Sequence, residues 1–207
     1  MSGKCVTDKI FKIHRIYENR KRGSIMKNKT QFLAYTAMLL ALTIVFQNLR
    51  LLIGTGFHSQ LIIGSLVNAA LVIAVGIINI YAGLIISIIA PIVAYAQSQI
   101  PPIFPYLIPI IAVGNALIVI CYNFFKDKKQ YLGIIIGALL KWAFLYYGVT
   151  KMLNIVKGTI PDNKFDKIAA TLSFGFSWPQ LITALVGGFI AIIVIKNLKK
   201  VLKNNYN

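Results

Sequence analysis

The feature that most constrains this chain is the length of its stretches without charge. Residues 31–97 contain one arginine, one histidine and no acidic residue. A soluble protein covers its surface with charged side chains, and a stretch like this has no such face to present to water. Over the whole chain 57% of residues are hydrophobic and 13% charged, and the apolar residues form long blocks without amphipathic periodicity. The sequence therefore predicts an all-α integral membrane protein.

The apolar blocks predict the number of crossings. About 17 to 25 apolar residues cross a hydrocarbon core roughly 30 Å thick, which predicts a bundle of six transmembrane helices within residues 27–207. The expected spans are 32–49, 61–79, 81–97, 104–125, 131–150 and 174–195. Because the uncharged run 61–97 is too long for one crossing, we expect a tight turn near Gly76–Gly83 and a kink at Pro91. Residues 1–26 form a basic polar extension that we expect to be disordered.

The basic residues predict the orientation. With the N-terminus inside, 16 of the 22 lysines and arginines fall on the cytoplasmic side and five outside, the remaining one being Lys141. Lys and Arg accumulate on the cytoplasmic side, so both termini are expected there. The net charge of +17 suits anionic membrane lipids as partners. Nucleic acid is not expected, because the basic residues flank the spans instead of interleaving with aromatics on a soluble module.

Several kinds of chemistry lack their residues. The sequence has no G-x-x-x-x-G-K-[ST] phosphate loop, and all five acids fall outside the expected spans. Cys5 and Cys121 have no metal-ligand spacing, and the two histidines, His14 and His58, fall on opposite sides of the membrane. We therefore expect neither an enzyme nor a metal or resident cofactor. The lack of an intramembrane carboxylate also disfavours a self-sufficient carrier driven by protons or sodium.

Lys141 is the charge that needs an explanation, because it lies in the middle of an expected span. About ten residues of helix separate it from either end, some 15 Å, which is farther than a lysine side chain reaches by snorkelling. Helical spacing places Gly133, Gly137, Lys141, Phe144 and Gly148 on one face, and the Gly133–Gly137 pair lets another helix approach closely. Lys141 is therefore expected inside the bundle, in contact with a ligand or in a structural or solvated role.

Other polar and aromatic residues lie at matching depths in the expected spans. Asn115 in the fourth span and Lys141 in the fifth are at similar depth, so they could share a cavity, although an interhelical hydrogen bond explains Asn115 equally well. Trp178 and Tyr146 suit ring stacking or an interfacial belt. The remaining candidates for substrate contact are Gln180, Gln97 and His58, the last in a segment, LLIGTGFHSQ, that is either a mobile lid or a plain loop.

The first span reads FLAYTAMLLALTIV, in which Ala37 and Ala41 form an A-x-x-x-A pair, and WPQLITALVGG stands near the last helix. With six short helices, cytoplasmic termini and no nucleotide motif, residues 27–205 resemble the substrate-binding S components of energy-coupling-factor (ECF) vitamin transporters. The A-x-x-x-A motif is unspecific by itself, since small-residue pairs are common in membrane helices.

The resemblance implies a subunit of a bacterial plasma membrane that captures a vitamin or related micronutrient outside and hands it inward by toppling. A coupling subunit, contacted through Ala37 and Ala41, and two ATPase subunits would drive that cycle. Family pockets lie between the outer loops and the fourth to sixth helices, where Lys141 would neutralise a carboxylate or phosphate. Two alternatives remain open: a structural or assembly membrane protein without ligand, and a self-sufficient carrier.

Overall fold

The computed structural model describes residues 29–54, 56–158 and 161–204, and these ranges form helices joined by turns and short connections. The extension 1–26 lies outside the described residues. No strand occurs in the described ranges, so the prediction of an all-α chain is confirmed there. The elements in chain order are α2 (Lys29–Asn48), α3 (Arg50–Ile53), α4 (Phe57–Ile73), the π-helix η1 (Ala74–Ile78), α5 (Ile80–Ala96), α6 (Leu107–Phe125), α7 (Gln130–Val156), α8 (Asp162–Gly175) and α9 (Trp178–Asn204).

Five helical stretches are long and apolar enough to cross a bilayer. They are Lys29–Ile53, Phe57–Ile78, Leu107–Phe125, Gln130–Val156 and Phe165–Val201. The helix α5 is equally apolar but has only 17 residues, at the lower limit for a crossing. The helices therefore support a multi-pass membrane protein, and the number of six crossings stays a prediction.

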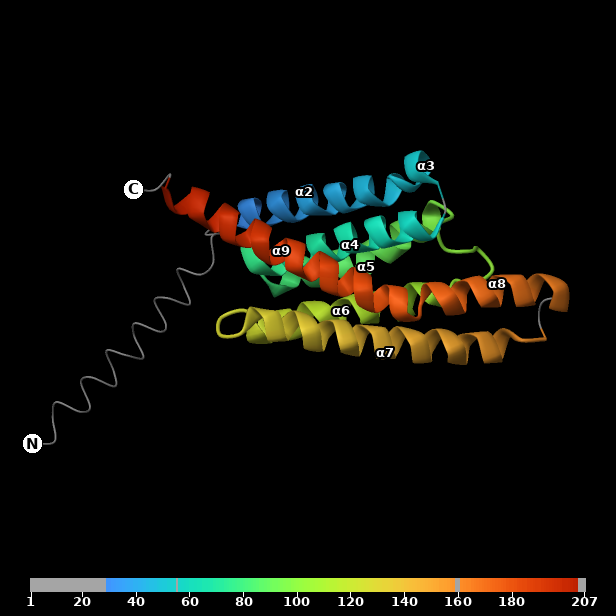
Figure 1. Ribbon diagram of the computed structural model, residues 1–207. Helices are drawn as coiled ribbons and strands as arrows, with labels where there is room; N and C mark the ends of the chain where they lie inside the picture. Colours follow the sequence, from blue (N-terminus) through green and yellow to red (C-terminus); the bar gives the residue numbers. More distant parts are fainter. Residues whose placement is uncertain (1–28, 55, 159–160, 205–207) are drawn as a thin grey trace, which may run out of the picture.

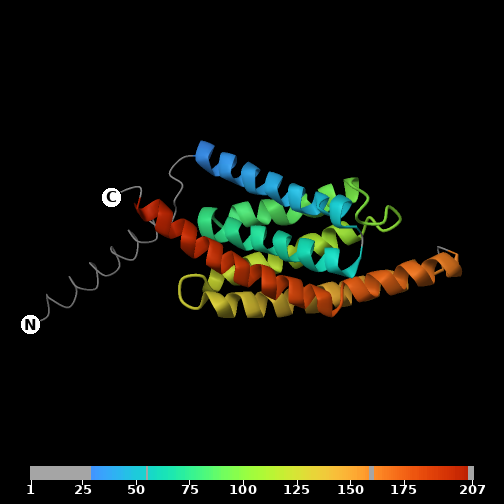
Figure 2. The same cartoon turned by 45° about the horizontal axis from the view of Figure 1, so that its top comes forward.

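The helices form an elongated bundle with two distinct ends (Figure 1, Figure 2). The start of α2, the end of α9 and the α6–α7 turn lie together at one end, which we call the basal end. The helix α3, the connection between α5 and α6 and most of α8 lie at the opposite, distal end. Within the bundle α4 packs on α9, α6 packs on both α5 and α7, and α2 leans on α4 and α5.

The chain reverses direction at Asn79, inside the region 76–83 where the sequence predicts a turn. Asn79 has an extended backbone, and its Oδ1 accepts a hydrogen bond from the Ala82 amide at 3.0 Å. Asparagine is a favoured N-cap because its side chain satisfies a backbone N–H at the start of a helix. The cap therefore lets α5 begin directly after η1 ends. Pro91 lies inside α5, and the kink expected there stays a prediction.

The distal end contains helix between the fifth and sixth expected spans, which were placed at 131–150 and 174–195. The helix α7 continues to Val156, and residues 162–175 form α8, which turns back toward the bundle (Figure 1). Phe165 and Leu172 of α8 are buried, seven residues apart on one helical face. This apolar contact explains how α8, which has a low overall hydropathy of its own, packs on the bundle.

Two apolar clusters fill the bundle. The basal cluster joins α4, η1, α5, α6, α7 and α9, and its fully buried members include Leu71, Val72, Ile86, Ile118, Val119 and Ile134. The distal cluster joins the end of α5, the α5–α6 connection, the start of α6, and the helices α7 and α8. Its buried members are Ala94, Ile100, Phe104, Leu107, Val149, Met152, Leu153, Phe165 and Leu172. A polar region around Lys141 lies between them.

Candidate functional site

Lys141 is buried in the middle of α7, with 3% of its side chain exposed. Its Nζ donates hydrogen bonds to Asn68 Oδ1 at 2.6 Å and to Asn115 Oδ1 at 2.8 Å. Both partners are neutral amides, so they solvate the amine without supplying an opposite charge. A lysine ammonium has three donors, and these two bonds leave one of them for another partner.

Small residues on α7 bring Asn115 of α6 within reach. A Cβ at Gly133 would lie 3.1 Å from the Cys121 carbonyl oxygen, and one at Gly137 would lie 3.1 Å from Ile118 Cα. The two helices therefore touch backbone to backbone beside Lys141. The same face continues at four-residue steps through Leu145 and Val149, which are both buried.

The prediction for this face was wrong at Phe144, whose side chain is 36% exposed. The reason is the helical phase. Three residues past Lys141 the helix has turned about 300°, whereas four residues place Leu145 nearer the packed line. Gly148 lies partly toward the bundle, where a Cβ would lie 3.1 Å from Ile110 Cγ2 of α6.

Asn68 of α4 completes the contact to Lys141 and was not among the residues predicted from the sequence. Its Nδ2 donates to the Gly64 carbonyl at 2.8 Å, which turns Oδ1 toward Lys141. Asn68 is 2% exposed. The signal was present in the sequence, because Asn68 is an isolated amide in the apolar run LIIGSLVNAALVI.

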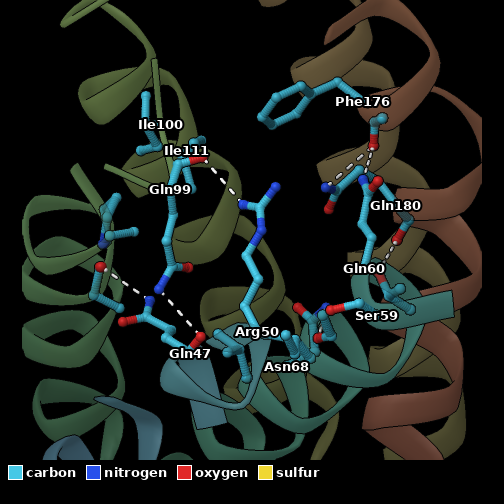
Figure 3. A pocket seen from close by; sticks show the side chains of 18 of the residues that line it. Gln47, Arg50, Ser59, Gln60, Asn68, Gln99, Ile100, Ile111, Phe176 and Gln180 are labelled. Atoms are coloured by element: carbon cyan, nitrogen blue, oxygen red, sulfur yellow. Dashed lines mark hydrogen bonds between the residues drawn. The ribbon is translucent and has the colours of Figure 1, made fainter. Parts of the chain in front are cut away.

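Lys141 and both asparagines line a cavity of about 320 Å³ that extends toward the distal end. This volume is near the lower end of the range for small-molecule sites, about 300 to 1,000 Å³. The wall also carries hydroxyls and amides from α2, α4, α8, α9 and the α5–α6 connection, including Gln47, Ser59, Gln60, Gln99, Thr171, Gln180 and Thr183. Figure 3 shows Gln47, Ser59, Gln60, Gln99 and Gln180 arranged around a central arginine.

That arginine is Arg50, the first residue of α3 and one of the five basic residues expected outside, which was not among the predicted site residues. Its side chain is half-buried, lines the cavity, and donates through Nη1 to the Gln99 carbonyl at 3.3 Å (Figure 3). Gln99 Nε2 in turn donates to the Gln47 carbonyl at 3.1 Å. These bonds connect the α2–α3 corner to the α5–α6 connection.

The cavity has an unbalanced charge. Lys141 and Arg50 are the charged residues that line it, and among the described residues no aspartate or glutamate does so. A buried cation is costly unless an anion or several dipoles accompany it. The arrangement therefore suits a small ligand with an acidic group.

The structure brings three of the predicted site residues together, namely Lys141, Asn115 and Gln180. The other four lie outside the cavity lining. Trp178 is 46% exposed and packs on Phe57 and Phe174, and Tyr146 is 50% exposed and stacks on Trp142. His58 is exposed beside Phe57. Gln97 accepts a hydrogen bond from Gln99 Nε2 and does not line the cavity. Phe176 is the aromatic side chain that the described lining contains.

A family model described as "ECF transporter, substrate-specific component" matches residues 31–198, which is most of the chain. The chain belongs to this family. The searches of curated proteins and of solved structures gave no match.

In this ECF substrate-specific component, the region matched by the family model runs from the first turn of α2 through most of α9. It therefore includes every element that lines the cavity. Membership identifies a membrane subunit of a transporter, which binds a small-molecule substrate and associates with an ECF module. It is a family of transporter components and not of enzymes. The resemblance stated from FLAYTAMLLALTIV is thereby confirmed.

Proposed function

We propose that this ECF substrate-specific component captures a small anionic vitamin or related micronutrient, and that the cavity around Lys141 is its binding site. One observation carries the proposal: the Lys141 Nζ lies between two neutral amide oxygens, in a cavity whose described lining contains no acid. A carboxylate or phosphate on the substrate would supply the missing charge. With water displaced from the site, that pairing becomes stronger.

Arg50 supports the same proposal from the other side of the cavity. The guanidinium has five N–H donors in a planar fork that matches carboxylates and phosphates, and one hydrogen bond to the Gln99 carbonyl occupies it in the structure. Gln180 and Gln60 both donate to the Gly175 carbonyl, at 3.5 Å and 2.8 Å, which leaves their side-chain oxygens as acceptors at the cavity wall. Arg50 would thus bind the acidic group of one compact solute, and the side-chain oxygens of Gln60 and Gln180 would accept hydrogen bonds from its polar edges.

The proposed direction of transport rests on the basic residues. Lys128, Lys129, Lys196, Lys199 and Lys200 lie at the basal end of the described chain, which we place in the cytoplasm on the positive-inside rule. The cavity extends toward the distal end, which then faces the outside of a bacterial plasma membrane. Capture would occur there, and delivery inward would require a coupling subunit and two ATPase subunits.

Ala37 and Ala41 are the proposed contact to the coupling subunit. Both are exposed on α2, on the side that is not packed against α4 and α5. Small residues let a second helix approach closely within a membrane.

The experiment that tests the function is native mass spectrometry of the purified chain, followed by binding measurements on Lys141→Met. We expect an anionic solute of vitamin size to be released, and the substitution to weaken its binding by about 2 to 5 kcal/mol. Lys151→Met is the matched control, since Lys151 is exposed on the same helix and should bind as wild type. Unchanged affinity in Lys141→Met would show that Lys141 is not part of the site. A separate experiment, co-purification with ATPase subunits, checks the proposed partners.

A further inference from the structure

The cavity contains two buried polar atoms without a partner among the described residues, Gln47 Oε1 and Ser59 Oγ. Their side chains are 6% and 3% exposed, and both line the cavity. A buried polar atom that lacks a hydrogen bond is costly, so each such atom in a native fold needs an explanation.

Ser59 differs from the other buried hydroxyls of the bundle by its position in a helix. Thr36, Thr43, Ser65 and Ser87 each donate to the carbonyl four residues earlier, at 2.7 to 2.8 Å. The buried Thr183 donates to the Gln180 carbonyl three residues earlier, at 3.1 Å. Ser59 is the third residue of α4, so the helix has no carbonyl four residues before it. Its hydroxyl therefore stays available to the cavity.

The side-chain amide of Gln47 is fixed in an orientation that leaves its oxygen, Oε1, without a hydrogen-bond donor. Its Nε2 donates to the Ala90 carbonyl of α5 at 3.1 Å. A carbonyl can only accept, so the amide cannot be flipped without losing this bond. The side-chain amide of the nearby Gln99 donates its two hydrogens to the backbone carbonyl of Gln47 and to Gln97 Oε1. Neither hydrogen reaches the side-chain oxygen Gln47 Oε1, which stays unpaired.

We propose that the substrate carries a hydroxyl or N–H donor that binds Gln47 Oε1, with Ser59 Oγ as a second partner for its polar edge. Gln47 then selects a hydroxylated or amide-bearing acid over the analogue without that donor. The inference rests on the proposed function, because Lys141 has to hold the acidic group. Figure 3 shows Gln47 and Ser59 on either side of Arg50, from α2 and α4, and the cavity is small enough for one compact solute to contact both.

Discrimination of this kind is strong, because a site built to hydrogen-bond a substrate group is left unpaired by an analogue that lacks it. An ordered water could instead satisfy Gln47 Oε1. In that case a hydroxyl on the ligand would bring no advantage, which makes the two explanations separable by measurement.

The test compares matched carboxylates that differ by one hydroxyl: lactate with propionate, malate with succinate, and 4-hydroxyphenylacetate with phenylacetate. Dissociation constants are measured on the purified full chain in detergent. In the wild type we expect the hydroxylated member of at least one pair to bind about 10- to 100-fold more tightly. In Gln47→Leu the ratio should fall to about twofold or less, and in Gln31→Leu, an exposed amide on the same helix, it should not change.

A loss of folding has a different signature from a loss of specificity. The acid that lacks the hydroxyl should bind Gln47→Leu within about twofold of its wild-type affinity. A collapsed site would instead lose affinity for both acids of the pair. If Gln47→Leu does not fold, Ser59→Ala, which removes one oxygen, takes its place and should lower the ratio about threefold or more.

The outcomes separate this inference from the proposed function. If the carboxylates bind but every pair binds equally in the wild type, or if the preference persists in Gln47→Leu and Ser59→Ala, the role of Gln47 is overturned and the anionic site stands. If no carboxylate binds the wild type, the proposed anionic site fails and this inference fails with it.

Discussion

The basal and distal halves of the bundle are built from the same kinds of helices and each contains an apolar cluster, yet the distal half also surrounds a polar cavity. The basal cluster joins six elements through side chains with almost no exposed surface. In the distal half, Lys141, Arg50 and several amides replace such side chains around about 320 Å³ of space. The difference indicates that the basal half supplies more of the packing, and that the distal half gives up part of its packing to form the proposed binding site.

The largest difference between the two halves is expected when side-chain volume is removed from each of them. Leu71 is fully buried in the basal cluster, so Leu71→Ala should lower the free energy of unfolding by about 2 to 5 kcal/mol. Ile63→Ala, at the cavity wall, should cost about half as much or less, because its side chain has fewer packing partners to lose. Denaturant unfolding in detergent measures both, and equal costs would contradict the division into two halves.

The second prediction concerns the contact between α4 and α9, which places Asn68. A Cβ at Gly187 would lie 2.8 Å from Asn68 Cβ and would also meet the Ser65 carbonyl oxygen. Gly187→Ala should therefore destabilise the fold by about 1 to 3 kcal/mol and displace Asn68 from Lys141. Gly56→Ala is the control for stability, since a Cβ there has no atom within 4 Å. Wild-type stability and binding in Gly187→Ala would contradict the close approach.

The third prediction adds volume to each half. Ala94 lines the cavity and Ala138 is fully buried in the basal cluster. Ala94→Leu should change the free energy of unfolding by less than about 1 kcal/mol while it blocks ligand binding. Ala138→Leu should instead lose about 1 to 3 kcal/mol of stability. The comparison would be wrong if Ala94→Leu bound ligand normally.

The smallest effect on stability is expected outside both halves, on the exposed side of α2. Ala37→Leu and Ala41→Leu should each change the free energy of unfolding by less than about 0.5 kcal/mol and leave ligand binding intact. Uptake by cells should nevertheless be lost, because a leucine would prevent close contact with the coupling subunit. Ala143→Leu, an exposed alanine of α7, should keep uptake. A loss of binding in Ala37→Leu would indicate a structural role for that face.

The sequence was informative where one residue type had one physical explanation. A lysine in the middle of an apolar span has to face the bundle interior, and depth along the helix placed Asn115 at its level. Both side chains do meet in the structure. The same depth argument would have applied to Asn68, but the spacing of residues does not say that α4 packs close enough to α7 for its amide to reach Lys141.

Other features depend on tertiary contacts that periodicity does not encode. Arg50 enters the cavity because the chain turns into α3 directly after α2, and Gln47 reaches it because the last turn of α2 packs on α5, where its Nε2 donates to the Ala90 carbonyl. The helix α8 was missed because its hydropathy is low and its helical conformation depends on burying Phe165 and Leu172. Tyr146 and Trp178 were placed near the site by depth alone, and the helical phase turns both away from it.

Gln47 has one consequence beyond the choice of substrate. It lies on the same helix as Ala41, six residues or fewer than two turns away, and its side chain holds α2 to the Ala90 carbonyl. If the substrate binds Gln47, and if the coupling subunit shifts α2 when it binds the outer side of that helix, the two binding energies are coupled. Thermodynamic linkage then requires that the coupling subunit change the affinity for substrate by the same factor by which the substrate changes the affinity for the subunit.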